Sequence, residues 1–274
     1  MSFKKMLALL MSVLSIAACA LPFSGCGKIV GNASDKDAKS GVVRNLTENI
    51  SKNDSGSKAA DKEFKAAAAS FSADLFKYNY SNGKTTLVSP LSVLTALALV
   101  QNGAEGETLV QLERELGGLD RDALNKYMRA YCDFLSTGDE LKIANSVWTD
   151  SSVEAKQAFL QKAVGRYSAQ IFSAPLSSKK TVSSINSWVK KNTDGMIPKI
   201  IENADRDAVM MLINAVAFDA KWETPYKRSD IEKLEFTSYS GSKKKTDFMC
   251  STENVYLKDG GTVGFMKPYK NGRF

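Results

Sequence analysis

Few residues in this chain are of types that could catalyse a reaction or bind a metal ion. This limits the classes of function that the chain could have. The 274 residues contain no histidine, which excludes Ser-His-Asp and Cys-His catalysis and any histidine metal ligand. The sequence also shows no paired nucleophile and base, so we expect no enzyme activity, no metal site and no cofactor. The polar residues of interest are an asparagine inside an apolar run and two serines that begin an apolar segment.

Asn214 is the polar residue of the ten-residue run 209–218, Val-Met-Met-Leu-Ile-Asn-Ala-Val-Ala-Phe. The run is too short to span a bilayer and predicts a β-strand buried on both faces. A buried amide without a partner is costly, so we expect Asn214 to be hydrogen-bonded. Ser89 and Ser92 offer hydroxyls from a helix beneath the strand, and we expect them to anchor Asn214. The alternative is a satisfied buried network with only a structural role.

The elements that would position these residues follow from apolar spacing and capping residues. Ser89 as N-cap and Pro90 at the first helical position predict a buried central helix that ends at Asn102-Gly103. Helices mixed with a long non-alternating strand predict an α+β fold, with a dominant mixed β-sheet over this central helix and several surrounding helices. Further helices are expected over about 61–78 and over 153–167. A short helix is expected from a capping box at Thr108 and Gln111 to Gly117-Gly118, and another from Ser183 or Ser184 to Gly195. Strands are expected over 141–148, 234–248 and 254–269.

The N-terminus has the features of an export signal. Lys4 and Lys5 precede an apolar stretch over 6–18, which corresponds to a charged n-region and an apolar h-region. Cys19 and Cys26 each follow small residues in a pattern similar to a bacterial lipobox, in which the cysteine is diacylated and becomes the mature N-terminus. Either cysteine fits as the lipidation site, and a plain secretory signal is the alternative.

The segment after the leader predicts a tether. From about 27 to 61 the chain is rich in Ser, Asn, Asp, Lys and Gly, which suits a flexible connection. We therefore divide the chain into a signal peptide with a lipobox cysteine (1–26), a flexible polar tether (27–61) and a folded domain (62–274). The expected location is extracellular, with the protein exported and lipid-anchored to the outer face of a bacterial membrane.

Composition and charge indicate an ordinary globular protein, with 43% hydrophobic and 24% charged residues. The formal charge of +7 includes a run at 243–245, which has no interleaved aromatic residues. This run predicts a solvated hairpin tip, and we expect no nucleic-acid binding. Cys132 and Cys250 have no metal or redox spacing, and two free thiols are expected rather than a disulfide.

Several separated motifs together resemble the serpin family. Each is weak alone, but they occur in the family's order and cover the chain from about Phe64 to Tyr269. The matching segments are Ser89–Ser92 followed by Gly103–Thr108, Ile185–Val189 followed by Thr193–Ile197, Leu212–Ala215 followed by Lys221-Trp222-Glu223, and Pro268-Tyr269.

The resemblance implies a serpin-like fold and suicide inhibition of serine proteases, with cysteine proteases as a second class of target. A protease would cleave an exposed reactive loop, and the loop would then insert as a new strand into the main sheet. The strand 209–218 would border the gap that the loop fills. Ser89, Ser92 and Asn214 would form a shutter-like polar network below the gap, and Trp222 would cover the top of the sheet.

The family pattern continues beyond Phe274, into the hinge, the reactive loop and the closing strands. We therefore expect the reactive loop to be absent from this chain, the domain to be incomplete at its C-terminus and the chain itself not to inhibit a protease. The full-length form is expected to be a monomer. The alternative is a non-inhibitory binding or structural surface lipoprotein of the same fold.

Overall fold

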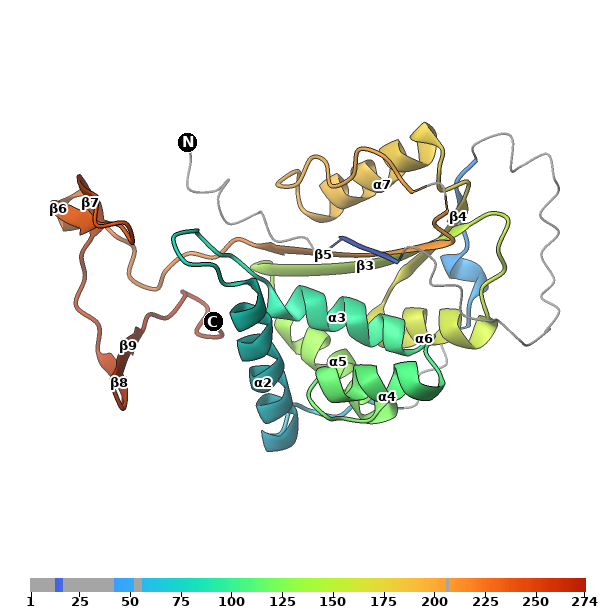
Figure 1. The fold of residues 1–274 in the computed structure, drawn as a ribbon, viewed down its shortest axis with the longest axis horizontal. Helices are drawn as coiled ribbons and strands as arrows, with labels where there is room; N and C mark the ends of the chain where they lie inside the picture. Colours follow the sequence, from blue (N-terminus) through green and yellow to red (C-terminus); the bar gives the residue numbers. More distant parts are fainter. Residues whose placement is uncertain (1–12, 17–41, 52–55, 206) are drawn as a thin grey trace. The chain divides into compact units, whose positions relative to one another are not determined.

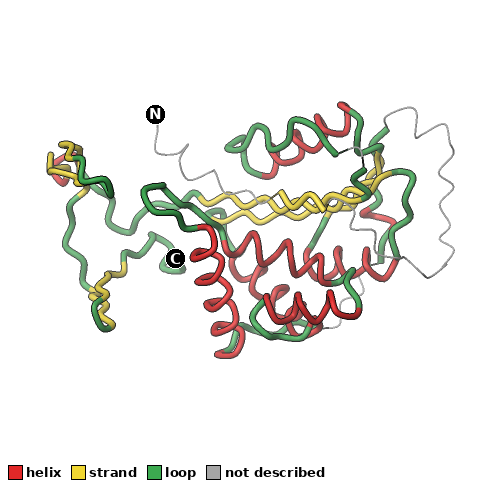
Figure 2. The backbone as a smooth tube through the Cα atoms, viewed as in Figure 1, coloured by secondary structure: helices red, strands yellow, loops and turns green. Residues whose placement is uncertain are grey.

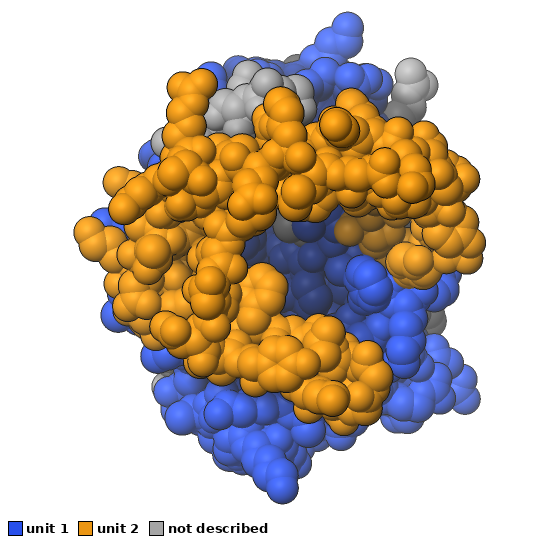
Figure 3. All heavy atoms as spheres, turned by 90° about the vertical axis from the view of Figure 1, so that its left-hand side faces the viewer, with its two compact units in different colours: residues 1–78, 87–218 blue, residues 79–86, 219–274 orange. Residues whose placement is uncertain are grey.

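The computed structural model describes residues 13–16, 42–51, 56–205 and 207–274. The chain divides into two compact units, which Figure 3 colours separately. Unit 1 comprises residues 1–78 and 87–218, and unit 2 comprises residues 79–86 and 219–274. The expected signal peptide and the first part of the expected tether lie mostly outside the described residues, so the cleavage and lipidation boundaries stay predictions. The described part of the tether differs from the prediction of a flexible segment, because residues 44–45 pair with the sheet and Ile50 is buried in the core.

A five-stranded mixed sheet forms the centre of unit 1, with strand order β1-β5-β3-β4-β2 (Figure 1). The two long central strands pair antiparallel, whereas β3 and β4 pair parallel. Short strands pair antiparallel at both edges, β2 with β4 and β1 with β5. The strands are β1 (Val13–Ile16), β2 (Arg44–Asn45), β3 (Leu141–Asp150), β4 (Gln170–Ala174) and β5 (Met210–Phe218), and a 3-10 turn, η2 (Thr47–Asn49), follows β2.

Helices cover both faces of this sheet (Figures 1 and 2). Five lie on one face and α7 lies on the other. Alternate residues of β5 accordingly enter two different cores: Leu212 packs with the five helices, and Met211 and Ile213 pack with α7. The predicted burial of this strand on both faces is confirmed. The helices are α2 (Lys62–Asn79), α3 (Pro90–Gln101), α4 (Gly106–Glu115), α5 (Arg121–Leu135), α6 (Gln157–Tyr167) and α7 (Lys179–Asn192).

The central helix α3 begins where the capping residues predict. The Ser89 side chain accepts a hydrogen bond from the backbone N–H of Ser92 at 3.3 Å, and Pro90 occupies the first turn. Leu94, Ala98 and other residues around the helix are buried, because α3 lies between the sheet and its neighbouring helices. The α+β fold with a central helix under a mixed sheet is therefore confirmed.

Three helix starts differ from the prediction. Helix α4 begins at Gly106, so Thr108 lies inside its first turn and does not cap it. Helix α7 begins at Lys179, and Ser178 caps it by accepting from the N–H of Lys180 at 3.2 Å. Helix α6 begins at Gln157, four residues after the expected start. Of these three starts, only that of α7 has a side-chain cap; α4 and α6 follow Glu105 and Lys156, whose side chains make no capping hydrogen bond. Capping residues in the sequence therefore did not locate the starts.

Helix α5 was not predicted from the sequence. Asp120 caps it by accepting a hydrogen bond from the N–H of Ala123 at 2.9 Å. Leu124, Tyr127 and Met128 are buried on one face, with the spacing that is typical of an amphipathic helix. The signal was therefore present in the sequence. Strand β4 was also missed, because its five residues carry little pattern of their own.

Unit 2 contains two antiparallel hairpins, as the short strands predicted. The lysines at 243–245 open the second strand and are exposed, and Lys243 pairs with Glu235 across the hairpin at 2.8 Å. Most of the side chains in these strands are exposed, including apolar ones. The hairpins pair β6 (Ile231–Thr237) with β7 (Lys243–Met249) and β8 (Val255–Asp259) with β9 (Thr262–Met266), and a 3-10 turn, η3 (Arg228–Asp230), precedes β6.

The described part of the chain contains no helix long and apolar enough to cross a bilayer. The lipobox candidates Cys19 and Cys26 lie outside the described residues, so lipidation stays a prediction. The other two cysteines, Cys132 and Cys250, are free thiols, as expected. Burial raises the pKa of Cys132 to about 12, which keeps this thiol protonated and inert.

Candidate functional site

Asn214 lies in the middle of β5, and 1% of its surface is exposed. It stands directly opposite Asn145 of β3 in the antiparallel pairing. The Asn214 Nδ2 donates a hydrogen bond to Asn145 Oδ1 at 2.8 Å. The expectation that the buried amide has a partner is confirmed, and the partner comes from the neighbouring strand.

The predicted hydrogen bonds from Ser89 and Ser92 to Asn214 are not formed. Ser89 uses its hydroxyl to cap α3, and Ser92 is fully buried with a hydroxyl that has no partner. The Oδ1 of Asn214 is likewise buried and unpartnered. The prediction failed because the cross-strand neighbour Asn145 already faces the amide, and strand register is not visible in one segment of sequence. A shutter-like role for these residues stays a prediction.

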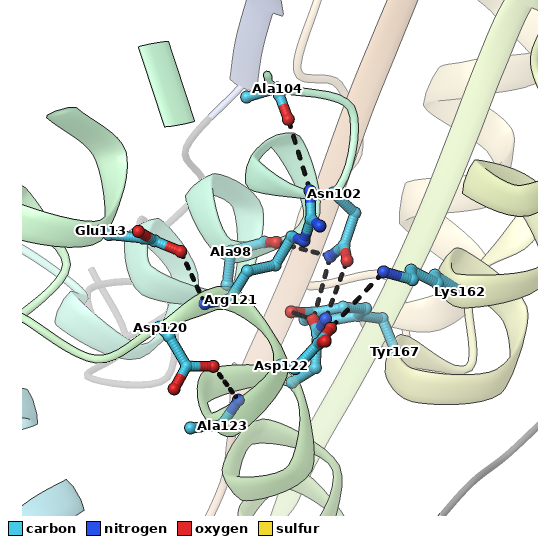
Figure 4. Close-up of polar contacts among 11 residues, drawn as sticks. Ala98, Asn102, Ala104, Glu113, Asp120, Arg121, Asp122, Ala123, Lys162 and Tyr167 are labelled. Atoms are coloured by element: carbon cyan, nitrogen blue, oxygen red, sulfur yellow. Dashed lines mark hydrogen bonds and ion pairs between the residues drawn. The ribbon is translucent and has the colours of Figure 1, made fainter. Parts of the chain in front are cut away.

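Asn145 extends the hydrogen bonding from the sheet into the helices. Its Nδ2 donates to the backbone carbonyl of Tyr167 at 2.8 Å, and the Tyr167 hydroxyl donates to Asn125 Oδ1 at 2.6 Å. Asn125 and Asn102 exchange two side-chain hydrogen bonds, and Asn102 also donates to the carbonyl of Ala98 in α3 at 2.8 Å (Figure 4). We call this chain of contacts the asparagine network: Asn214, Asn145, Tyr167, Asn125 and Asn102.

The asparagine network links β5 to α3 indirectly, through β3, α6 and α5. Burial raises the pKa of the Tyr167 hydroxyl far above its usual range, so this group stays protonated and serves as a donor. A buried polar network stabilises one arrangement of its elements when its members are paired. Within the asparagine network, Asn214 Oδ1 is unpartnered and lies on the α3 side of the sheet. The Ser92 Oγ on α3, outside the network, is also buried and unpartnered.

Further polar contacts fix the start of α5 beside this network (Figure 4). The backbone N–H of Arg121 donates to Glu113 at 2.9 Å, and its guanidinium donates to the carbonyl of Ala104 at 3.4 Å. Asp122 pairs with Lys162 of α6 at 3.6 Å. These contacts tie α4, α5 and α6 together, which holds the helices under the sheet.

Sequence reasoning missed four of the five network residues. Asn145 carried the same signal as Asn214, an amide inside an apolar strand, and could have been found in that way. Asn102 was interpreted only as a helix terminator. Tyr167 and Asn125 carry no local signal, because their contacts join residues 42 positions apart in the chain.

Trp222 belongs to unit 2 and stacks on Tyr269, with ring centroids 4.2 Å apart and an interplanar angle of 14°. The two residues also form an isolated antiparallel bridge. Lys267 lies 5.8 Å from the Trp222 ring centroid and forms an ion pair with Glu253. The structure thus brings together two of the sequence motifs. The predicted cover by Trp222 at the top of the sheet stays a prediction.

The edge of β5 opposite β3 carries the short strand β1. The pairing is antiparallel and joins residues 13–16 to residues 210–213. This edge of β5 is therefore paired with a short segment from the N-terminal part of the chain. Within the part of the chain that the structure describes, no group of three or more His, Cys, Asp or Glu side chains could hold a metal ion.

The fold and this site define a class of protein: an α+β domain that has a mixed sheet with helices on both faces, a short strand paired along the edge of β5 and a buried polar network. The chain belongs to the serpin family, because residues 66–271 match the description "Serpin (serine protease inhibitor)". Members of this family are typically protease inhibitors.

Curated relatives support this assignment. Serpin-Z2A from Oryza sativa subsp. japonica is 34% identical over 195 residues, which are 67% of this chain and 46% of the relative. Alpha-1-antitrypsin 1-1 from Mus musculus is 26% identical over 231 residues, which are 80% of this chain and 56% of the relative. The chain thus spans about half the length of the curated relatives that it matches.

Solved structures have the same fold. The native state of tengpin, a thermophilic serpin, has a TM-score of 0.76 and 41% sequence identity, covering 84% of this chain and 60% of that one. A loop C-sheet serpin polymer has a TM-score of 0.76 and 41% identity, covering 81% of this chain and 60% of that one. The predicted serpin-like fold is confirmed.

Proposed function

We propose that this chain belongs to a surface-tethered inhibitor of serine proteases, with cysteine proteases as a second class of target. In its full-length form the protein acts by reactive-loop cleavage and insertion. The loop inserts along the edge of β5 that lies opposite β3. Family membership supports the class of activity, and the ability of this edge to pair with a further strand is the observation that supports the mechanism.

The strand now at this edge lies within the predicted leader. β1 covers residues 13–16, and the apolar stretch of the leader covers residues 6–18. In the proposed mature protein the leader is removed before Cys19 or Cys26, β1 goes with it, and the edge of β5 is free. A cleaved loop then takes the place of β1 and continues beyond Ile213, where the β1 pairing ends.

Insertion is favourable for two physical reasons. A free strand edge has unpaired backbone N–H and C=O groups. A new strand pairs with these groups and covers apolar residues of β5. The buried Oδ1 of Asn214 and hydroxyl of Ser92 also lack partners. A polar side chain on the inserted strand can pair with one of them, and a buried unpaired group of this kind costs about 1–3 kcal/mol. The polar network thus favours the inserted state.

The test is a covalent complex between the full-length protein and a protease. We expect SDS-stable complexes with a member of a panel containing trypsin, chymotrypsin, elastase, subtilisin and papain. The same proteases with their nucleophiles chemically blocked should give none, and neither should the chain that ends at Phe274. Cleavage or reversible binding without a stable complex would contradict the proposal and favour the non-inhibitory binding protein.

We also propose the lipid anchor and an extracellular location on a bacterial membrane. The leader, the lipobox cysteines and the polar tether support both. Metabolic labelling with an alkyne fatty acid should modify the protein. One of the two single substitutions, Cys19→Ala or Cys26→Ala, should abolish the labelling, and this identifies the lipidated cysteine. Labelling that survives the double variant would contradict the anchor and leave a plain secreted protein.

A further inference from the structure

Helix α7 and the segment that follows it form an open groove of about 450 Å³. The helix supplies one wall, and residues 198–203 run back along it as the other. The polar side chains that line the groove include Lys179, Ser183, Ser187 and Lys190 from α7 and Lys199 and Glu202 from the returning segment. The groove lies within unit 1 and is separate from the β5 edge.

Asn186 holds the two walls together. Its Oδ1 accepts hydrogen bonds from the backbone N–H groups of Ile200 at 2.8 Å and Ile201 at 3.2 Å. Its Nδ2 donates to the carbonyl of Ile201 at 2.9 Å. Val182 and Ile201 are each 8% exposed and pack in the core below. The groove is therefore fixed before any ligand arrives, which lowers the entropy cost of binding.

The groove carries an excess of positive charge. Three lysines face one carboxylate, Glu202, which pairs with Lys199 at 3.1 Å. Within the described part of the chain, neither Lys179 nor Lys190 has an ion-pair partner. Both are exposed, and the Ser183 and Ser187 hydroxyls lie between them on the same helix face. The groove thus presents free ammonium groups with neutral hydrogen-bond donors in between.

The spacing of the lysines sets the size of a ligand. Lys179 and Lys190 are eleven residues apart in α7, which corresponds to about 16 Å along the helix. A single small anion cannot reach both. Ammonium and hydroxyl donors suit the tetrahedral oxygens of phosphate or sulfate groups, and lysine binds such groups as a point charge.

We propose that this groove binds a short linear oligoanion that carries phosphate or sulfate groups. One end of the ligand lies at Lys190 and Lys199, and the other end lies at Lys179. Glu202 limits the affinity, because its carboxylate neutralises Lys199 and repels the ligand. This binding is independent of the proposed protease inhibition.

Lys179 is adjacent to Lys180 and Lys190 to Lys191, and only the first of each pair lines the groove. These pairs allow a matched test in the full-length chain. Isothermal titration with inorganic tripolyphosphate and with a sulfated tetrasaccharide distinguishes the two sources of charge. We expect one site, and we expect Lys190→Glu or Lys179→Glu to weaken binding about five- to tenfold, since each replaces an attraction with a repulsion. Glu202→Gln should tighten binding about two- to fivefold.

The controls are Lys191→Glu and Lys180→Glu, which change the same net charge on the same helix turns but do not line the groove. Their affinities should stay within about twofold of wild type. Equal weakening by all four variants would show diffuse attraction to the basic surface and overturn the proposal. Absence of binding to both ligands at low salt would overturn it as well. Circular dichroism of each variant confirms that α7 is intact.

Discussion

The strands of unit 1 and the hairpins of unit 2 contain similar apolar residues but are stabilised in different ways. Leu212 of β5 is 1% exposed, and it packs between the sheet and the helices. Leu234 of β6 is 43% exposed, and its strand pairs with β7 in a two-stranded hairpin. An apolar strand pattern therefore predicts a strand in both units, but only tertiary packing decides whether that strand contributes a core.

This difference predicts that side chains of unit 1 contribute more to the free energy of unfolding than side chains of unit 2. In unit 1, the side chains on each face of the sheet pack against helices, and truncation of one of them removes those contacts. In unit 2, the exposed residues contribute mainly cross-strand pairs, which are worth a fraction of a buried side chain. Substitutions of the same type in the two units should separate these contributions.

The largest effect is expected from the same leucine truncation in the two units. Leu212→Ala should lower the free energy of unfolding by about 3 kcal/mol, because it leaves a cavity in a packed core. Leu234→Ala should lower it by less than about 0.5 kcal/mol. Urea unfolding followed by far-ultraviolet circular dichroism measures both. Equal losses would show that the hairpin side chain is as well packed as the core.

A smaller effect is expected in the asparagine network. Asn145→Ala removes the partner of Asn214 and the donor to Tyr167, so it should cost about 2 kcal/mol for buried groups left unpaired. Asn254→Ala in unit 2 is the matched control, because Asn254 is exposed, and its stability should equal wild type. A neutral Asn145→Ala variant would mean that the network contributes nothing to the fold.

The smallest effect is expected in the pH dependence of stability that arises from Asp150. Burial of Asp150 acts to raise its pKa, but hydrogen bonds from Ser152 and from the N–H of Leu176 outweigh it and leave the pKa below its usual range. Because the folded-state pKa is lowered, the charged carboxylate stabilises the fold above about pH 4, and this contribution is lost as the pH falls further.

Asp150→Asn should therefore be less stable than wild type at pH 7, and the difference should shrink below about pH 4. Ser152→Ala keeps the carboxylate and removes the hydroxyl donor, so it should show an intermediate dependence. Thermal unfolding between pH 3 and pH 7 measures all three proteins. A difference that stays constant across this range would show that Asp150 acts through packing and not through its charge.

Local signals explain what could be predicted from the sequence. The Ser89-Pro90 start of α3 depends on adjacent residues, and the apolar run around Asn214 is long enough to identify a buried strand. The contact between Asn214 and Asn145 depends on strand register, and the stacking of Trp222 on Tyr269 joins distant segments. Neither was predicted, because tertiary pairing is not encoded in any single window of the sequence.

Helix boundaries failed for a related reason. Ser178, Ser183 and Ser184 can all cap a helix, and the structure uses Ser178. The first residues of α7 are lysines, which give no apolar signal, so the first turn was missed. The first of these lysines, Lys179, lines the groove beside α7, which explains why sequence reasoning did not find that site.

The most direct test of the proposed strand insertion is amide hydrogen exchange in β5 of the proposed full-length protein, before and after a protease cleaves the proposed reactive loop. The account predicts that amides within residues 214–218 that are not paired with β3 exchange at least about tenfold more slowly after cleavage, because a new strand pairs with them. Amides of the β6–β7 hairpin should not change. Unchanged exchange in β5 after complete cleavage would contradict insertion at this edge.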